Sequence, residues 1–517
     1  MRNLIRKEIE KVVGAAQRAL PGGDKADFDV FISEGFGDYS SNVAMILKKD
    51  PENLKSQISN LKSGLFEKIE VAGPGFLNFW LSEKGMEKGL KNLGKKAAKG
   101  EPRQGREKIQ VEFISANPTG ELHLGHGRNG FYGNALANIL EETGYKVERE
   151  FFINDSKEST QVKEIGKTAL GKGKTYLTEN LKSQISNLKS KLPDSESEAG
   201  YLLAQEIQKD NQEFITKILG IKFDKWFSEE KELRSKGEFK KTLEMLKDKN
   251  LTFEKDGATW LKTSEYEDEE DRVLVRSTGD IGYFLSDIAY HINKFKRGFD
   301  NVINVWGADH QGHVKRMLAV KKMLGWKGGL EILICQLVTL KEAGESKKMS
   351  KRAGTIVWLK DLIKEVGVDV AKWFCLEKSL STHMEFDMSL AKERSEKNPV
   401  FYVQYANARM ASIINKSVVS SQLSVVSIKN LKHPSEISLV KKLIQYKEVI
   451  EDIAKDYQVN RLTTYAYELA YAFSVFYRDV HVLGSENEKE LLNLVAITKK
   501  ILQNTLNLLG ISTPDKM

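Results

Sequence analysis

The sequence predicts an α/β fold with a parallel sheet in the middle of the chain, between a smaller mixed domain and a helical bundle. The first observation is a succession of strand, helix and strand patterns: "KIQVEFIS" at 108–115, "NGFYGNALANILEETG" at 129–144 and "YKVEREFFIND" at 145–155. Parallel strands need such a crossover, so this unit predicts a parallel sheet. Two further strand patterns, "NVINVWGAD" and "EILICQLVTL", flank the helical "HVKRMLAVKKMLG" and continue the alternation of a Rossmann-type sheet.

The second observation is the helical spacing of apolar residues after Arg394. Four long segments show it, at 401–416, 436–456, 461–484 and 489–510. They predict an all-α helical-bundle domain over 395–517.

The first hundred residues predict an α+β domain. They begin with the amphipathic pattern "MRNLIRKEIEKVV" and reach the strand-like "FEKIEVAGPGFLNFWLS" before the basic, glycine-punctuated "KNLGKKAAKGEPRQGREK". We place domain boundaries so that this domain covers 1–98 and the parallel-sheet domain, with insertions, covers 99–394.

Composition is typical of a globular chain of several domains. The 517 residues exceed what one core usually organises, and 40% of them are hydrophobic. The net charge of +8 permits a polyanionic partner without identifying one. Only Cys335 and Cys375 are present, among apolar neighbours, so they are interpreted as buried thiols in a reducing compartment. No leader peptide or membrane span is evident, and we expect a cytoplasmic protein.

An identical stretch, "ENLKSQISNLKS", occurs at 52–63 and again at 179–190. The surrounding sequences are unrelated and no regular period follows, so a solenoid repeat is not indicated. The interpretation is a pair of inserted surface segments with little functional consequence.

The segment "SANPTGELHLGHGR" places two histidines and little bulk where the first crossover helix begins. A helix N-terminus at the carboxyl edge of a parallel sheet attracts phosphate. We therefore expect His123 and His126 to donate hydrogen bonds to phosphate oxygens, with Gly125 letting a flat base approach. The alternatives are capping histidines or a zinc site, but no neighbouring cysteine or histidine cluster completes a metal site, and none is predicted.

A second candidate nucleotide element is the polar loop "KEAGESKKMSKRAGTIV". Lys348 and Lys351 bracket Met349 and Ser350, and their ammonium groups are suited to the charge that develops on pyrophosphate. The rival interpretation is an ordinary solvated lysine loop.

Together these residues resemble the two signatures of class I aminoacyl-tRNA synthetases, HIGH and KMSKS, here "HLGH" and "KMSKR". The blocks "VEFISANPTGELHLGHGR", "DIAYH", "VWGADHQGH" and "NPVFYVQYANAR" are similar, in order, to those of arginyl-tRNA synthetases, and the likeness covers nearly the whole chain. Two departures are the arginine that ends KMSKR and the tract "RSTGDIGYFLSDIAYH" before the aspartate. The resemblance implies ATP-dependent ligation of arginine to tRNA(Arg) through an arginyl-adenylate, with Mg²⁺ assisting and with bound tRNA required for the first step.

For arginine, a planar cation with five donors, a selective pocket needs carboxylates and flat partners. Tyr283 and Asp287 are four apart and so share one face of an expected helix. The resemblance assigns the arginine site to six residues: Glu112, Ser115, Asn117, Glu229, Tyr283 and Asp287. Taken singly, each has a purely structural alternative, such as a helix cap, a core tyrosine or a solvated acid.

The resemblance also implies ATP contacts around "WGADHQGH", where Gly307, Asp309 and His310 are expected at the carboxyl end of a strand. A structural turn is the alternative there. Gly125, Met349 and Ser350 complete the expected ATP site.

For tRNA, the helical domain is the expected anticodon-binding domain and the first domain is expected to contact the tRNA corner. Unpaired bases stack on aromatic side chains and bond polar ones. The candidate residues are Phe76, Asn78, Tyr402, Gln404, Tyr405, Asn407 and Arg409. A monomer is expected. The alternatives are a class I synthetase for another amino acid and a non-catalytic tRNA-binding relative.

Overall fold

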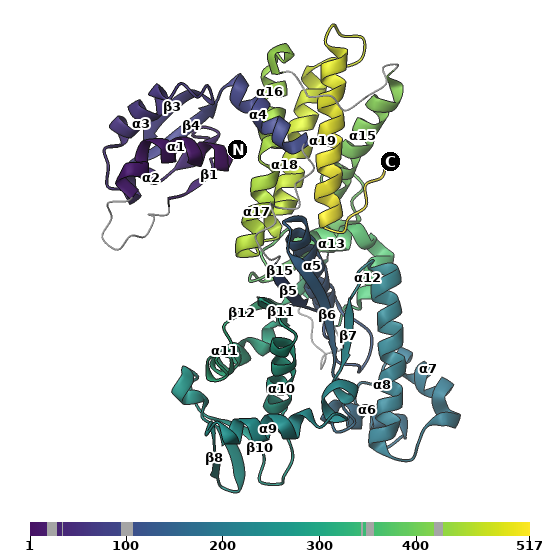
Figure 1. Ribbon diagram of the computed structural model, residues 1–517. Helices are drawn as coiled ribbons and strands as arrows, with labels where there is room; N and C mark the ends of the chain where they lie inside the picture. Colours follow the sequence, from purple (N-terminus) through teal and green to yellow (C-terminus); the bar gives the residue numbers. More distant parts are fainter. Residues whose placement is uncertain (18–27, 34, 95–106, 343–344, 348–355, 418–427) are drawn as a thin grey trace.

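The computed structural model describes residues 1–17, 28–33, 35–94, 107–342, 345–347, 356–417 and 428–517. Figure 1 shows three parts along the chain: a small mixed domain, a central domain built on a parallel sheet, and a bundle of long helices. The α/β class, the α+β start and the helical end are all as the sequence predicts.

The N-terminal domain packs helices against a four-stranded antiparallel sheet with the order β1-β2-β4-β3. Its core includes Ile5, Ile9 and Phe79, each with 0% exposure. Its elements are α1 (Arg2–Gln17), β1 (Val30–Ile32), β2 (Tyr39–Ser41), α2 (Val43–Ile46), α3 (Pro51–Asn60), β3 (Phe66–Ala72), β4 (Phe76–Leu81) and α4 (Glu83–Gly94).

The central domain is organised by a five-stranded parallel sheet with the order β12-β11-β5-β6-β7. Its strands are β5 (Lys108–Glu112), β6 (Lys146–Ile153), β7 (Lys225–Ser228), β11 (Asn301–Gly307) and β12 (Gly329–Cys335). The chain leaves β5 towards β6 on one side and returns with β11 on the other. The resulting switch point between β5 and β11 is where doubly wound sheets bind ligands, at the carboxyl ends of their strands.

Helix α5 (Leu124–Glu142) is the crossover between β5 and β6, as predicted. It packs closely on the sheet because its glycines leave no side chain in the way. A Cβ at Gly133 would lie 2.2 Å from Phe113 Cγ, and one at Gly130 would lie 2.7 Å from Ile114 Cδ1.

Insertions between the sheet strands build the lower half of the molecule in Figure 1. Between β6 and β7 lie α6 (Thr160–Ala169), α7 (Glu179–Leu188), α8 (Glu196–Glu213) and the π-helix η2 (Phe214–Ile218). After β7 come a π-helix, η3 (Glu230–Arg234), α9 (Glu238–Asp248), a three-stranded sheet and two more helices. These last are β8 (Thr252–Lys255), β9 (Ala258–Leu261), β10 (Arg272–Val275), α10 (Tyr283–Lys296) and α11 (Val314–Met323).

The predicted strand "EILICQLVTL" is divided between two sheets. Its first half is β12, and its second half is β13 (Val338–Glu342), which pairs with β14 (Glu345–Lys347) and β15 (Met384–Asp387). The break comes at Gln336, where the backbone bonds Leu380 and the buried Arg128 donates to the Gln336 carbonyl. Helices α12 (Leu359–Val366), α13 (Val368–Leu376) and α14 (Met388–Lys392) accompany this sheet.

The C-terminal bundle contains the predicted helices with one change. The segment 436–456 forms two helices that meet at Gln445 rather than one. The bundle comprises α15 (Pro399–Lys416), α16 (Pro434–Ile444), α17 (Tyr446–Asp456), α18 (Asn460–Asp479) and α19 (Glu488–Leu508).

The N-terminal domain is attached to this bundle by ion pairs and apolar contacts. The Met1 amino group and the Tyr39 hydroxyl both bond the carboxylate of Glu448 on α17, and Arg2 bonds Asp452 one turn further on. Glu448 is only 2% exposed. The first domain therefore lies beside α16 and α17, as Figure 1 shows.

The two identical segments both fold as helices, α3 and α7. Each buries the same leucine of the repeat, Leu54 or Leu181, while Ile58 is buried and its counterpart Ile185 is only half-buried. Much of each helix is exposed, as the surface interpretation expects. Their functional importance stays a prediction.

Candidate active site

Helix α5 begins at the carboxyl edge of the sheet with the two predicted histidines. His123 is the N-cap residue, and its Nδ1 accepts the backbone N–H of His126 at 3.3 Å. In return, His126 Nδ1 accepts the backbone N–H of His123 at 3.3 Å. The two rings stack with their centroids 3.6 Å apart. The two histidines therefore do cap the helix, as the capping alternative expects. This capping also determines which ring nitrogens are free to donate.

Because both Nδ1 atoms accept backbone hydrogen bonds, each neutral ring carries its proton on Nε2. The pair thus presents N–H donors at a helix N-terminus, where the macrodipole also favours anions. Gly125 lies between them, and a Cβ there would come within 3.1 Å of the His123 ring. The local chemistry suits phosphate oxygens, which is the binding role that the sequence predicts for these histidines.

The second expected ATP segment lies at the carboxyl end of a sheet strand, β11, as predicted. Gly307 is the last residue of β11, which pairs with β5. A Cβ at Gly307 would stand 2.6 Å from Asp309 Oδ1, so a larger residue there would displace the Asp309 side chain. The side chains of Asp309 and His310 are 83% and 54% exposed, and Asp309 Oδ2 lies 3.6 Å from His310 Nε2. Both are open to a ligand at the switch point.

Lys348, Met349, Ser350 and Lys351 lie outside the described residues, so the loop prediction stays a prediction. The chain on the carboxyl side of the loop is described, and it contacts the histidine segment. Trp358 forms an antiparallel bridge with His123, and the backbone of Leu124 bonds Val357. Backbone hydrogen bonds therefore join the HLGH segment to the described residues that follow the KMSKR loop.

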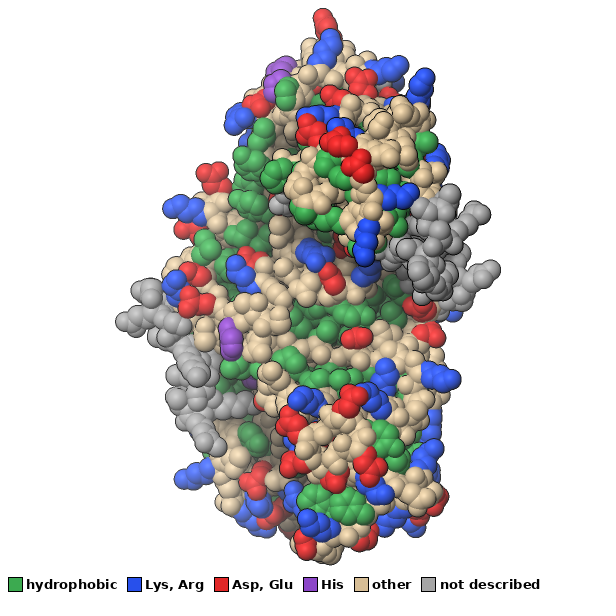
Figure 2. All heavy atoms as spheres, turned by 90° about the vertical axis from the view of Figure 1, so that its left-hand side faces the viewer, with side chains coloured by type: hydrophobic (Ala, Val, Ile, Leu, Met, Phe, Trp, Pro, Cys, Tyr) green, Lys and Arg blue, Asp and Glu red, His purple; other side chains and the backbone are tan. Residues whose placement is uncertain are grey.

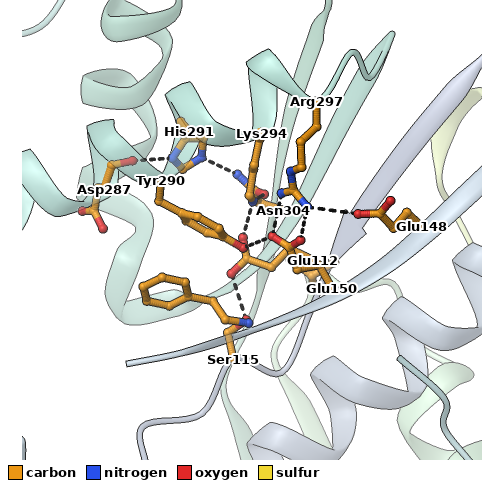
Figure 3. A network of polar contacts seen from close by, with 12 residues as sticks. Glu112, Ser115, Glu148, Glu150, Asp287, Tyr290, His291, Lys294, Arg297 and Asn304 are labelled. Atoms are coloured by element: carbon orange, nitrogen blue, oxygen red, sulfur yellow. Dashed lines mark hydrogen bonds and ion pairs between the residues drawn. The ribbon is translucent and has the colours of Figure 1, made fainter. Parts of the chain in front are cut away.

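Glu112, the last residue of β5, is bonded by protein groups on both carboxylate oxygens. Oε1 accepts the hydroxyl of Ser115, and Oε2 accepts the ammonium of Lys294 on α10. Glu112 is 5% exposed and Lys294 is 0% exposed. Figure 3 shows this buried pair at the centre of a larger polar network. Glu112 thus anchors Ser115, and any contact with arginine would be added to these bonds.

The network continues along one face of α10. Asn304 on β11 accepts from Lys294 and also bonds His291, whose other ring nitrogen contacts the Asp287 carbonyl. Tyr290 donates a hydrogen bond to Glu150, which also forms an ion pair with Arg297. Six residues of the network are not among those that the sequence predicts for the site: Lys294, Tyr290, His291, Arg297, Asn304 and Glu150. The spacing of polar residues three and four apart in "DIAYHINK" was the available signal.

Asp287 lies at the edge of this network, which it joins through its backbone carbonyl and His291, as Figure 3 shows, and it is half-buried. Burial, together with the nearby carboxylates of Glu229 and Glu112, raises the pKa of Asp287 to about 7. Lys294 and Arg316 oppose that rise. A crowded carboxylate of this kind is stabilised when a cation arrives beside it. Burial lowers the pKa of His291 to about 3, so the imidazole is neutral at physiological pH.

A cavity of about 560 Å³ is lined by Ser286, the neighbour of Asp287, and by two of the predicted arginine residues, Glu229 and Tyr283. Glu229 lines it and accepts the hydroxyl of Ser286, while burial raises the pKa of the Glu229 carboxyl. Tyr283 lines the entrance and is 55% exposed. Asn117 is bonded to Asn154, another lining residue, at 3.1 Å. Of the six predicted residues, Glu229 and Tyr283 line the cavity itself, and the other four are not among its lining residues.

The predicted tRNA residues of the helical domain divide into two groups. Tyr405 is 44% exposed, and its hydroxyl is bonded by Arg409, which also bonds Tyr477. These side chains line a groove of about 510 Å³ with Phe401, Tyr402 and Phe473. The sequence-based candidates do not include three of the lining residues, Phe401, Phe473 and Tyr477. For Tyr477, the spacing of aromatic residues along α18 was the available signal. The groove is suited to stacking unpaired bases.

Gln404 and Asn407 belong to the second group, because they hold the C-terminal segment. Asn407 is 0% exposed and donates to the Pro514 carbonyl, and Gln404 donates to Asp369 and to the Ser512 carbonyl. The surface role expected of Asn407 needs correction for this reason. In the N-terminal domain, Asn78 is 4% exposed and bonded to Ser40, so it too offers little surface. Phe76 is half-buried against Phe31.

Charged side chains of both signs cover one face of the molecule. On the face shown in Figure 2, basic and acidic side chains of the described residues are interspersed rather than gathered by sign. Of the helices that the structure describes, none has the length and apolar character needed to span a membrane.

The parallel sheet, the paired histidines at its edge and the helical bundle that follows are typical of a class I tRNA synthetase. Comparisons with known proteins support this class. Residues 90–162 and 161–387 match the model of the class I (R) tRNA synthetase catalytic domain. Residues 1–81 match the arginyl-tRNA synthetase N-terminal domain, and residues 403–517 match the DALR anticodon-binding domain.

Curated relatives cover the whole chain. An arginine–tRNA ligase of Halalkalibacterium halodurans is 37% identical, covering 100% of this chain and 99% of its own. One from Caldanaerobacter subterraneus is 38% identical, with 100% of both chains covered. This chain belongs to the arginyl-tRNA synthetase family. The arginyl-tRNA synthetase structures of Thermus thermophilus and Plasmodium falciparum share its fold, with TM-scores of 0.78 and 0.79 at 20% identity; the first covers 100% of both chains, and the second covers 100% of this chain and 99% of its own.

Proposed function

We propose that this protein ligates L-arginine to tRNA(Arg) at the expense of ATP, releasing AMP and pyrophosphate. The observation that carries the proposal is the succession of the three family domains along one chain, with full-length curated relatives named arginine–tRNA ligase. The site at the switch point of the sheet supports it chemically, because it combines phosphate donors with a carboxylate-rich cavity.

In the proposed first step, the arginine carboxylate attacks the α-phosphate of ATP, giving arginyl-adenylate and pyrophosphate. His123 and His126 donate from Nε2 to phosphate oxygens, and Lys348 and Lys351 stabilise the pyrophosphate charge. Gly125 and Gly307 leave room for the nucleoside, Asp309 or His310 bonds the ribose, and Met349 and Ser350 complete the loop. Catalysis arises from positioning and charge stabilisation, without a covalent enzyme intermediate.

In the proposed arginine site, Glu229 binds the guanidinium from the cavity wall, Asp287 binds it from beside the cavity, and Tyr283 covers its plane. Glu112 contributes negative charge and fixes Ser115, while Asn117 holds the main-chain end. Two carboxylates and an aromatic ring match the planar, permanently charged group better than a single charge would.

In the second step, the terminal ribose hydroxyl of tRNA takes the arginyl group. We place unpaired anticodon-loop bases in the groove formed by Tyr402, Tyr405 and Arg409, and the tRNA corner near Phe76. Binding of tRNA is expected to be required for the first step. We also propose a monomer in the cytoplasm, for which gel filtration and cell fractionation are the tests.

Mg²⁺ is proposed to arrive with ATP. Among the described residues, no three histidine, cysteine or acidic side chains form a group that could hold a metal ion. The ion would offset phosphate charge, and the chain's own residues would orient the substrates.

The decisive experiment is ATP–pyrophosphate exchange with each of the twenty amino acids, with and without total tRNA. Exchange with arginine alone, only when tRNA is present, is expected. Exchange with another amino acid would refute the pocket assignment, and no exchange from folded, tRNA-binding protein would favour a non-catalytic relative.

A further inference from the structure

The chain reverses in an unusual way where β5 enters the arginine site. Ile114 has φ 66° and Ser115 has φ 40°, both in the left-handed region. The backbone N–H of Ser115 bonds the Phe113 carbonyl two residues earlier, so Ile114 is the centre of a γ-turn with positive φ. Such turns are rare and strained, and a β-branched residue suits them least. The surrounding structure must therefore hold Ile114 in place.

The turn would otherwise leave a buried donor without a partner. Ile114 is 7% exposed, and its N–H points into the protein, where Asn129 Oδ1 accepts it at 2.5 Å. The same side chain donates through Nδ2 to the Val305 carbonyl at 2.8 Å. Asn129 is 6% exposed, and these two partners fix the orientation of its amide.

Asn129 therefore connects three parts of the proposed site. It stands one turn after His126 on α5, it holds the turn that precedes Ser115 and Asn117, and it bonds β11 two residues before Gly307. Ser115 in turn bonds both Glu112 and the backbone N–H of Phe152. A shift of the turn would move the arginine-side groups relative to the phosphate-side histidines.

We infer that Asn129 is a positioning residue, which holds the strained Ile114 turn and thereby sets the arginine-binding loop against the nucleotide-binding helix. This inference rests on the proposed function. It assigns Asn129 no contact with either substrate.

The test is the arginine KM in tRNA arginylation, measured for Asn129→Ala and for a matched control, Asn138→Ala. Asn138 lies on the same helix and donates to the backbone carbonyl of Leu508, away from the site. Asn129→Ala is expected to raise the arginine KM about tenfold, equivalent to about 1.4 kcal/mol, and to lower kcat, with a change in ATP KM of under about twofold. Asn138→Ala is expected to leave the arginine KM unchanged. Equal effects of the two variants would overturn the inference.

Ile114→Gly separates positioning from general damage, because glycine adopts positive φ without strain. In protein that already carries Ile114→Gly, adding Asn129→Ala is expected to raise the arginine KM by under about threefold. The effect of Asn129→Ala would then depend on Ile114, which is not expected of an unrelated structural loss. If the double variant raised the arginine KM by the product of the two single effects, the inference would be overturned.

Asn129→Asp keeps the acceptor for Ile114 and is expected to stay within about threefold of wild type. A loss as large as that of alanine would contradict the role. If Asn129→Ala does not fold, Asn129→Ser provides the same comparison with Asn138→Ala. Failure of wild-type protein to arginylate any tRNA would refute the proposed function instead, so the two failures are distinguishable.

Discussion

Lys294 and Glu112 form an ion pair in the interior of the catalytic domain, 182 residues apart in the chain. Removing one partner of such a pair leaves an uncompensated buried charge. We therefore expect Lys294→Met to lower the free energy of unfolding by about 3–5 kcal/mol, measured by urea denaturation. Changing both residues, in Glu112→Gln with Lys294→Met, should cost less.

A surface pair provides the control for that measurement. Lys315 bonds Glu269 with both side chains well exposed, so Lys315→Met is expected to leave the urea midpoint unchanged. Equal destabilisation by Lys294→Met and Lys315→Met would show that the buried pair contributes no more to the free energy of unfolding than the exposed pair.

Arginine binding should strengthen as the pH rises from 6 to 8. The pKa of Asp287 is raised to about 7, so its carboxylate, which attracts the guanidinium, is increasingly ionised over that range. Below the pKa, affinity is expected to fall by up to about tenfold per pH unit, as measured by calorimetric titration with arginine. Asp287→Asn should bind weakly and with little pH dependence. A flat wild-type profile would exclude Asp287 as the titrating group.

The same shift predicts a stability change of definite sign. The folded state holds the Asp287 proton more tightly than the unfolded state, whose pKa is near 3.8. Stability from this group is therefore greatest at low pH and declines as the pH rises through about 7. Thermal melts of Asp287→Asn should lack this contribution, and a wild-type difference of the opposite sign would contradict it.

His126→Ala should lower kcat for arginylation by about 100-fold, the scale of one lost transition-state donor, with little effect on arginine affinity. His433→Ala is the matched control, because His433 caps α16 with the same reciprocal bonding far from the site. Each variant loses one hydrogen bond of a reciprocal capping pair, in which His126 is the N3 residue of α5 and His433 is the N-cap residue of α16, worth about 1 kcal/mol. Similar kcat values for the two would reduce His126 to a capping residue.

Tyr405→Ala should raise the KM for tRNA about 5- to 150-fold, since stacking on one base is worth about 1–3 kcal/mol. Arginine affinity should not change. Tyr471, on α18 beside a different groove, is more exposed, at 59%, and Tyr471→Ala is the control with little expected effect. If both tyrosines matter equally, the groove of Tyr405 and Arg409 is not the specific base site.

The sequence predicts this molecule best where the signal is local. The strands and the crossover helix follow from apolar runs and spacing, and the position of His123 and His126 at a helix start follows from the same pattern. Partners distant in the chain were not predictable. Nothing near Asn407 indicates that Pro514 takes its amide, and nothing near Glu112 indicates Lys294. The break at Gln336 likewise depends on Arg128, which lies on another element.

The attachment of the N-terminal domain has a consequence for dissecting this enzyme. Glu448 receives the Met1 amino group and the Tyr39 hydroxyl, and the side chain of Ile444 would lie within 2.7 Å of a Cβ at Gly89 on α4. Cutting away the first domain would strip α16 and α17 of their cover, exposing apolar surface and an acidic group that is now enclosed. A shortened chain would thus be a poor stand-in for the whole, and loss of its activity would say little about tRNA contacts. Point substitutions at exposed positions are the safer way to map them.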